Sequence, residues 1–290
     1  MRPGRAGAPW KTRARQAAGD VLFRAGGSPS RASGLAILMY HAVTARTIHD
    51  RMQMSVSADL FASHMACLRS LDIDIVPLRE GVKRVGQAVG DRLAVSVTFD
   101  DGFAGVYEHA LDALKTYRIP ATVFVTTSWV GKAAFPEGDP SLGRPLTWGE
   151  IATLAGEGGC RIGSHTHTHP RLTTVGDTAL LEELRRSRDL IAANVGAAPR
   201  EFAYPFGSYE SFSARTQEAL AAEQFALGCT TVWGRNFPNG DPLELKRLRM
   251  SWCDSPRELR KSLAGCYDWY RIVQRLQAHG KAEPPAALAC

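Results

Sequence analysis

Two neighbouring carboxylates and a pair of histidines stand out as residues that could do chemistry together. Asp100 and Asp101 follow the apolar residues 93–97, and His165 and His169 follow a second short apolar run. Adjacent carboxylates repel each other, so such a pair usually needs a cation or a proton nearby. One carboxylate and two imidazoles form a three-ligand set with open positions, which is typical of a hydrolytic metal centre. The spacing therefore predicts a site for a divalent metal ion.

Other polar residues also fall just after apolar runs. His41 closely follows residues 35–39, and Phe206 closely follows residues 201–204. In a parallel barrel, the catalytic groups lie at the carboxyl ends of the strands. A plain turn at the two carboxylates and ordinary loop histidines are the alternative, but two such clusters after buried strands favour a shared site. We therefore expect all of these side chains at one end of a barrel.

Short apolar strands alternate with amphipathic helices along the chain. The helices are predicted over residues 57–71, 107–117, 148 onward, 177–195, 212–222 and 256 onward. The strands are predicted over residues 35–39, 73–76, 93–99, 121–125, 160–163, 201–204, 225–229 and 245–250. Such strands, each followed by a helix, indicate a parallel sheet buried on both faces. Roughly seven units favour closure, so the predicted fold is α/β, a distorted (β/α)7 barrel similar to a TIM barrel.

The chain of 290 residues is 44% apolar, which is ordinary for a globular protein. No apolar run approaches the roughly 18 residues that a membrane-spanning helix needs, and the N-terminus lacks the apolar region of a secretory signal. None of the six cysteines has a Cys-x-x-Cys spacing, so we expect free thiols in a reducing compartment rather than a zinc–thiolate site. These features predict a cytoplasmic enzyme, or one at the inner membrane surface.

The positive charge is concentrated at the N-terminus. Of the 35 basic and 29 acidic residues, seven basic and one acidic lie in residues 1–31, which leaves 28 of each in the remainder. A Gly/Pro/Ser cluster at residues 26–30 ends this segment. We therefore predict a flexible basic segment over residues 1–31, a barrel over residues 32–280 and a tail over residues 281–290. The basic segment is either a solvated tail or a contact with an anionic membrane surface. No nucleic-acid partner is expected, because no basic–aromatic patch continues into the body.

Three motifs together carry a family resemblance. They are Thr-Phe-Asp-Asp-Gly at residues 98–102, Ser-His-Thr-x-x-His-Pro at residues 164–170 and Tyr-Pro-Phe-Gly at residues 204–207. In this order they resemble the polysaccharide deacetylases, the NodB-homology domains of carbohydrate esterase family four, over about residues 35–250. The resemblance implies a metal-dependent hydrolase that removes N-acetyl groups from the amino sugars of a glycan or glycan precursor and releases acetate.

The resemblance also implies a role for each motif residue. Asp101, His165 and His169 would hold the metal, and Asp100 would be the general base that takes a proton from the attacking water. The backbone N–H of Phe206 would face the developing oxyanion. Zinc is the first expectation for one carboxylate and two imidazoles, although Co²⁺ or Ni²⁺ could use the same ligands.

Two features of the family are missing from this sequence. Many members carry an arginine shortly before the proline of the third motif, where it restrains the catalytic carboxylate. Here Arg200, Arg247 and Arg249 are the candidates to reach Asp100, and we prefer Arg247. The C-terminal Leu-x-His motif that supplies the general acid elsewhere is also absent. His41 is our candidate for that acid, and the alternative is a polar group satisfied beneath the barrel rim.

Two other functions remain open on the sequence alone. The same barrel could be an amidase or an O-acetyl esterase for another substrate, because the chemistry at the metal would be the same. It could also be a non-catalytic glycan-binding module, although binding alone would not need Asp100 beside the metal. The expected partner is an N-acetylated glycan, and the oligomeric state stays open.

Overall fold

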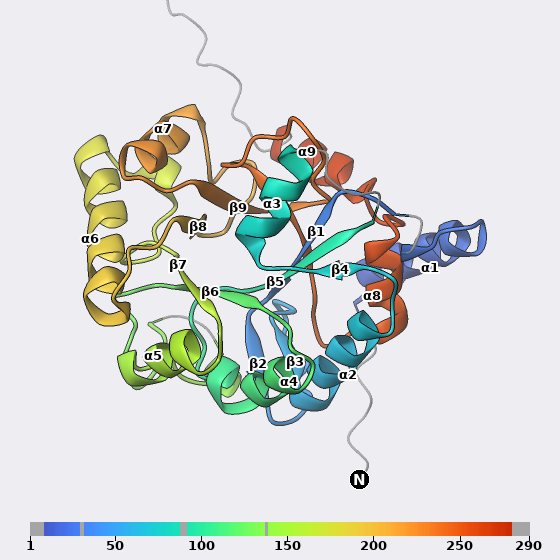
Figure 1. The fold of residues 1–290 in the computed structure, drawn as a ribbon. Coiled ribbons are helices and arrows are strands. Elements are labelled where there is room, and N and C mark those ends of the chain that lie inside the picture. Colours follow the sequence, from blue (N-terminus) through green and yellow to red (C-terminus); the bar gives the residue numbers. More distant parts are fainter. Residues whose placement is uncertain (1–8, 30–31, 88–91, 137–138, 280–290) are drawn as a thin grey trace, which may run out of the picture.

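Seven parallel strands close into a ring (Figure 1). The computed structural model describes residues 9–29, 32–87, 92–136 and 139–279. Within them β1 pairs with both β10 and β5, which closes the barrel. In ring order the strands are β1 (Leu35–Tyr40), β10 (Leu245–Arg249), β9 (Leu227–Trp233), β8 (Glu201–Ala203), β7 (Arg161–Ser164), β6 (Ala121–Val125) and β5 (Ala94–Phe99). The predicted (β/α)7 barrel is therefore confirmed.

Three further strands lie outside the ring. The predicted strand at residues 73–76 is the short β4 (Asp74–Ile75), which pairs with the first half of β5. Two strands that the sequence analysis did not predict, β2 (Ala42–Thr44) and β3 (Ser55–Ser57), form a small parallel pair of their own.

Most of the helices surround the barrel and cover its outer surface, whereas α3 lies across one end of the ring (Figure 1). The helices are α1 (Trp10–Arg24), α2 (Ala58–Arg69), α3 (Leu78–Gly86), α4 (Leu111–Thr116), α5 (Trp148–Gly156), α6 (Asp177–Val195), α7 (Ala214–Ala222), α8 (Pro256–Leu263) and α9 (Tyr270–His279). Every residue of β1 and of β5 is buried, as expected for strands covered on both faces. The helix α5 begins at Trp148 as predicted, and a capping box at Thr147 starts it. The helix predicted from residue 107 differs, because Val106–Ala110 form a wider π-helical turn before α4.

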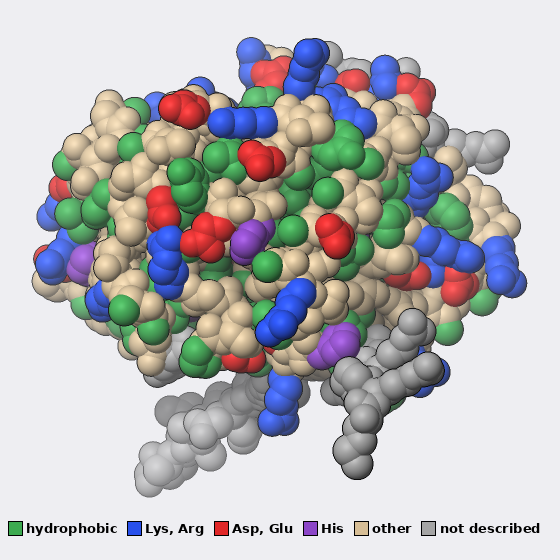
Figure 2. Space-filling model, turned by 90° about the horizontal axis from the view of Figure 1, so that it is seen from below, with side chains coloured by type: hydrophobic (Ala, Val, Ile, Leu, Met, Phe, Trp, Pro, Cys, Tyr) green, Lys and Arg blue, Asp and Glu red, His purple; other side chains and the backbone are tan. Residues whose placement is uncertain are grey.

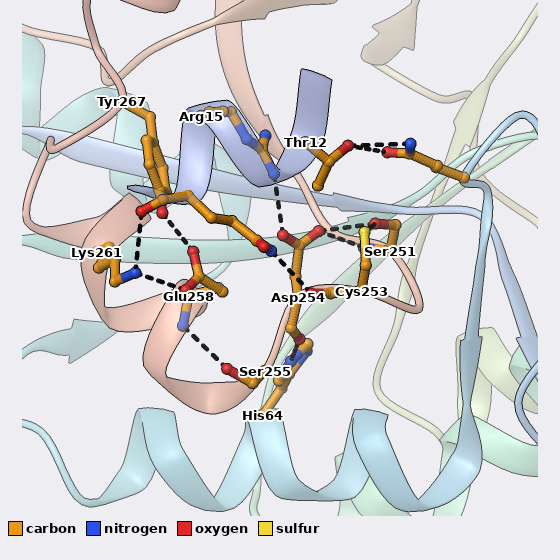
Figure 3. A network of polar contacts seen from close by, with 12 residues as sticks. Thr12, Arg15, His64, Ser251, Cys253, Asp254, Ser255, Glu258, Lys261 and Tyr267 are labelled. Atoms are coloured by element: carbon orange, nitrogen blue, oxygen red, sulfur yellow. Dashed lines mark hydrogen bonds and ion pairs between the residues drawn. The ribbon is translucent and has the colours of Figure 1, made fainter. Parts of the chain in front are cut away.

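Residues 10–24 are not a flexible segment but the helix α1, which lies against α8 (Figures 1 and 3). The contacts that hold it are polar. Arg15 pairs with Asp254 at 3.0 Å, and Asp20 pairs with Lys261 at 2.7 Å. This docking leaves no local apolar pattern in the sequence, because ion pairs with residues far along the chain hold the helix. The predicted boundaries at residues 31 and 281 lie at or beyond the edge of the described residues and stay predictions.

The surface charge agrees with a neutral body. Acidic and basic side chains are interspersed over the face shown in Figure 2. Within the described residues all five cysteines are free. No described helix combines the length and the apolar character required to cross a bilayer.

A buried histidine joins the barrel to the helix layer. His64 on α2 is 0% exposed, its Nε2–H donates to the Asp254 carbonyl at 2.6 Å, and its Nδ1 lies 3.0 Å from the Tyr40 hydroxyl. Because a carbonyl can only accept, Nε2 carries the proton and Tyr40 donates to Nδ1 of the neutral ring. Burial lowers the pKa of His64, although the nearby Asp254 opposes that shift.

We expect this histidine to make the protein less stable in mild acid. A base with a lowered pKa in the native state contributes stability that is present above its unfolded pKa of about 6.5 and is lost as the pH falls below it. The unfolding free energy of the wild type should therefore fall more steeply between pH 7 and pH 5 than that of His64→Gln. Urea denaturation across this range measures both slopes, and equal slopes would contradict the assignment.

Candidate active site

Asp101, His165 and His169 converge on one point at the carboxyl end of the barrel strands. Nε2 of His165 lies 3.2 Å from Oδ1 of Asp101, and Nε2 of His169 lies 3.5 Å from the same oxygen. One ligand atom from each residue lies within 4.8 Å of the other two. Asp101 follows β5, and the two histidines follow β7. The structure thus brings together the three residues that the sequence analysis selected as metal ligands.

The backbone at this site adopts conformations that L-residues rarely use. Asp101 has a φ of 67°, Thr166 of 68°, His169 of 66° and Phe206 of 63°. Each such residue costs of order 1–3 kcal/mol and persists only where the surrounding structure enforces it. These four are half of the eight non-glycine residues with positive φ in the described chain. Their backbone strain lowers the stability of the fold and holds the side chains of the site in place.

Hydrogen bonds hold the His165 imidazole and the backbone of the loop that carries His169. Nδ1–H of His165 donates to the Ala203 carbonyl at 2.7 Å, so Nε2 is the nitrogen that faces Asp101: it donates to that carboxylate when protonated and offers its lone pair to a metal ion when neutral. Oγ1 of Thr166 donates to the His165 carbonyl at 2.5 Å and accepts from the His169 backbone N–H at 2.9 Å. These two bonds tie the loop that carries both histidines to itself. An imidazole fixed through its other nitrogen is typical of a metal ligand.

Glu183 on α6 supports the same loop, and the sequence analysis missed it. Its Oε2 accepts from the backbone N–H of His167 at 2.8 Å and of Thr168 at 2.7 Å. Ser187, one turn further along α6, bonds Ser164 at 2.6 Å. The spacing of Glu183 and Ser187 places them on one helical face, but in the sequence this face looks like any other charged helix surface.

Asp100 is held by a buried arginine. Nη1 and Nη2 of Arg247 donate to Oδ1 and Oδ2 of Asp100 at 2.7 and 2.6 Å, a two-point fork. Asp100 is 2% exposed and Arg247 is 0% exposed. Nε of Arg247 donates to the Thr230 carbonyl at 2.7 Å, which fixes the guanidinium from behind. Arg247 therefore occupies the place that the sequence analysis preferred for it, whereas the side chains of Arg200 and Arg249 are exposed.

The two adjacent carboxylates are both stabilised in their charged form. Burial raises the pKa of Asp101, but hydrogen bonds with His165 and His169 outweigh it and hold that pKa well below its ordinary value. Burial likewise raises the pKa of Asp100, and the Arg247 charge more than compensates, so that pKa is also lowered. Each carboxylate thus has its own positive partner, which removes the conflict between neighbouring like charges.

The remaining predicted residues lie around this pair. Nδ1 of His41 is buried without a hydrogen-bond partner among the described residues. Burial lowers the pKa of His41, while the charges of Asp101 and Asp100 oppose that shift, so His41 lies within electrostatic reach of both. The Phe206 ring is 53% exposed and lies 5.0 Å from the His169 ring. The Trp129 ring also lies 4.8 Å from the His169 ring.

The comparisons with known proteins agree with this geometry. The family model described as polysaccharide deacetylase matches residues 88–225. The poly-beta-1,6-N-acetyl-D-glucosamine N-deacetylase of Staphylococcus aureus (strain MSSA476) is 27% identical over 161 residues, which are 53% of this chain and 54% of that protein. The chain thus spans about half the length of these curated relatives.

Two solved structures share the fold over most of their length. The Streptococcus pyogenes deacetylase PplD, in complex with acetate, has a TM-score of 0.68 at 24% identity and covers 79% of this chain and 98% of its own. IcaB from Ammonifex degensii has a TM-score of 0.66 at 26% identity and covers 81% of this chain and 98% of its own. Over residues 88–225 the chain is similar to the polysaccharide deacetylases, which its three motifs also resemble.

The Asp100–Arg247 pair generates a stability prediction. Removing one partner leaves an uncompensated buried charge, so Arg247→Met should lower the unfolding free energy by about 3–5 kcal/mol. The double variant Asp100→Asn/Arg247→Met removes both charges and should recover most of that loss. Urea denaturation of Arg247→Met, Asp100→Asn and the double variant measures the coupling energy between the two side chains. Simply additive effects on the unfolding free energy would contradict the prediction.

Proposed function

We propose that this protein is a metal-dependent hydrolase that removes N-acetyl groups from a poly-N-acetylglucosamine-like glycan and releases acetate. The observation that carries the proposal is a buried, charged Asp100 directly beside the three-residue cluster of Asp101, His165 and His169. The S. aureus relative, named as an N-deacetylase of poly-beta-1,6-N-acetyl-D-glucosamine, supports this substrate class.

The three-residue cluster fits a divalent ion. Two imidazole Nε2 atoms face one carboxylate oxygen, and His165 is fixed in the tautomer that leaves Nε2 available. Asp101, His165 and His169 would hold the ion, and the mixed nitrogen and oxygen donors favour Zn²⁺, with Co²⁺ or Ni²⁺ as alternatives. When bound, such an ion polarises a carbonyl group and lowers the pKa of water.

The residues around the cluster would have three different roles: one accepts a proton, one donates a proton and one stabilises the developing negative charge. Asp100, held in its charged form by Arg247, would accept the proton of the attacking water. His41, which interacts electrostatically with the same two carboxylates, would deliver a proton to the departing amine nitrogen. The backbone N–H of Phe206, which pairs with no acceptor among the described residues, would donate to the oxyanion and stabilise it by about 3 kcal/mol.

We expect zinc binding to separate these residues into two groups. In isothermal titration of chelator-treated protein, Asp101→Asn, His165→Gln and His169→Gln should each weaken zinc binding at least about tenfold, because each removes a ligand. His167→Gln is the matched control from the same loop, since the His167 ring instead lies 2.9 Å from the Thr127 hydroxyl. His41→Ala should also keep the metal. Unchanged zinc affinity in the first three variants would contradict the assignment of these residues as metal ligands.

Deacetylation itself tests the function. Zinc-loaded protein should release acetate and one free amine per event from N-acetylglucosamine oligomers linked β-1,6, and Asp100→Asn should lower kcat by about 10²–10⁴-fold. Mass spectrometry of the oligomer distinguishes this reaction from O-deacetylation, which leaves no free amine. Equal turnover by the wild type and Asp100→Asn would exclude Asp100 as the general base. Binding of the oligomer without acetate release would favour the non-catalytic glycan-binding module.

His41 should separate catalysis from metal binding. His41→Ala should lower kcat at least tenfold with little change in KM, because the imidazole would act on the leaving group rather than on the bound sugar. The pH profile of kcat should lose its alkaline limb in this variant. Full activity in His41→Ala would leave His41 as a polar group beneath the rim.

A further inference from the structure

The N-terminal helix α1 turns its polar side toward the barrel, which is the reverse of an ordinary surface helix. A helix on a globular protein normally turns its apolar side toward the core. In α1 the side facing the barrel is polar: Arg15 pairs with Asp254, Gln16 donates to the Cys253 carbonyl at 3.0 Å, and Thr12 bonds Gln53 (Figure 3). The docking of α1 therefore leaves its apolar side unused by the barrel.

This inward polar side is anchored firmly. Asp20 pairs with Lys261, which is 1% exposed and also bonds Glu258 at 2.6 Å. Gly19 lies against the Tyr267 ring so closely that a Cβ there would be 2.2 Å from a ring carbon. The orientation of α1 is thus fixed by ion pairs and a close approach, and the helix cannot rotate to bury its other side without breaking them.

The outward side of α1 is almost entirely apolar. Trp10 is 75% exposed, Val21 is 68% exposed and Leu22 is 46% exposed. Smaller side chains continue the same stripe at helical spacing, and the exposed ones are Ala14, Ala17 and Ala18. Exposed apolar stripes of this kind mark contact surfaces rather than ordinary solvated faces.

The charges beside the stripe are positive. Arg13 and Arg24 are exposed on α1, whereas the single acidic residue of the helix, Asp20, is turned toward Lys261 and Arg257. At the C-terminal end of α1 an open hollow, lined in part by Phe23, adds two further guanidinium groups, Arg257 and Arg260. An apolar stripe with cationic flanks and an aromatic residue near one end is the pattern of helices that lie in a lipid interface.

We infer that α1 is a docking surface for an anionic lipid bilayer, lying parallel to the bilayer with Trp10, Val21 and Leu22 inserted among the acyl chains. Arg13 and Arg24 lie at the level of the lipid phosphates. The charge complementarity favours an anionic lipid surface over a second copy of this chain, because a second copy would need a matching acidic groove and the face of this chain in Figure 2 shows interspersed charge. The inference does not depend on the proposed deacetylase activity.

Vesicle co-sedimentation of the full chain tests this directly. Vesicles of phosphatidylglycerol and phosphatidylcholine at 3:7 should bind the wild type, and vesicles of phosphatidylcholine alone should bind it at least about tenfold more weakly. Arg13→Gln/Arg24→Gln should reduce binding to the anionic vesicles about 25-fold, about fivefold for each charge. Val21→Ser/Leu22→Ser should reduce it at least about tenfold.

The matched control is Ile272→Ser/Leu276→Ser on α9, which changes two apolar residues of similar exposure, 58% and 66%. It should bind anionic vesicles like the wild type, and thermal unfolding should be unchanged in all three double variants, since only exposed side chains are altered. Equal binding to both kinds of vesicle, or equal loss in the α9 variant, would overturn the inference. So would sedimentation velocity that shows a dimer dissolved by Val21→Ser/Leu22→Ser, because the stripe would then join two copies of the chain.

Discussion

The site depends on giving two adjacent carboxylates different electrostatic partners. Asp100 and Asp101 cannot both stay charged in a buried place unless each has its own positive or proton-bearing neighbour. Arg247 serves Asp100 through a two-point fork, and the two imidazoles face Asp101. The backbone angle φ is positive at Asp101, with a value of 67°, but not at Asp100. This difference between neighbouring residues directs the two side chains to different places. One carboxylate is thereby directed to the base position and the other to the metal position.

The barrel makes this division possible by bringing distant strand ends together. Asp100 follows β5 and Arg247 lies within β10, so the β1–β5 pairing that closes the ring brings these two residues together. The histidines follow β7, which is separated from β5 only by β6, and this places them beside Asp101. Outside the ring, Glu183 and Thr166 tie down the histidine loop. The strained backbone at Asp101 and His169 is maintained by these surrounding contacts, which is the usual arrangement where geometry matters more than local stability.

Features that arise from local sequence patterns could be predicted from the sequence, and features that arise from contacts between distant residues could not. The alternation of strands and helices indicated the barrel, and the spacing of the three motifs selected the residues that converge. Arg247 could be preferred only by its position on the last strand, since its fork with Asp100 spans 147 residues. Glu183 and the docking of α1 gave no local signal, because a charged residue that bonds a distant loop looks the same in sequence as one that faces solvent. The π-helical turn before α4 was missed for a different reason: it spans only five residues, which are too few to reveal a spacing different from that of an α-helix.

The central claim is that Asp101 and the two histidines hold one divalent ion while Asp100 stays on Arg247. Anomalous diffraction at the zinc edge, from crystals grown with zinc, examines both halves of that claim at once. The account predicts a single strong peak bonded to Asp101, His165 and His169, with the Asp100–Arg247 fork intact. A peak bonded to Asp100 with the fork broken, or a peak elsewhere with those three side chains turned apart, would contradict it.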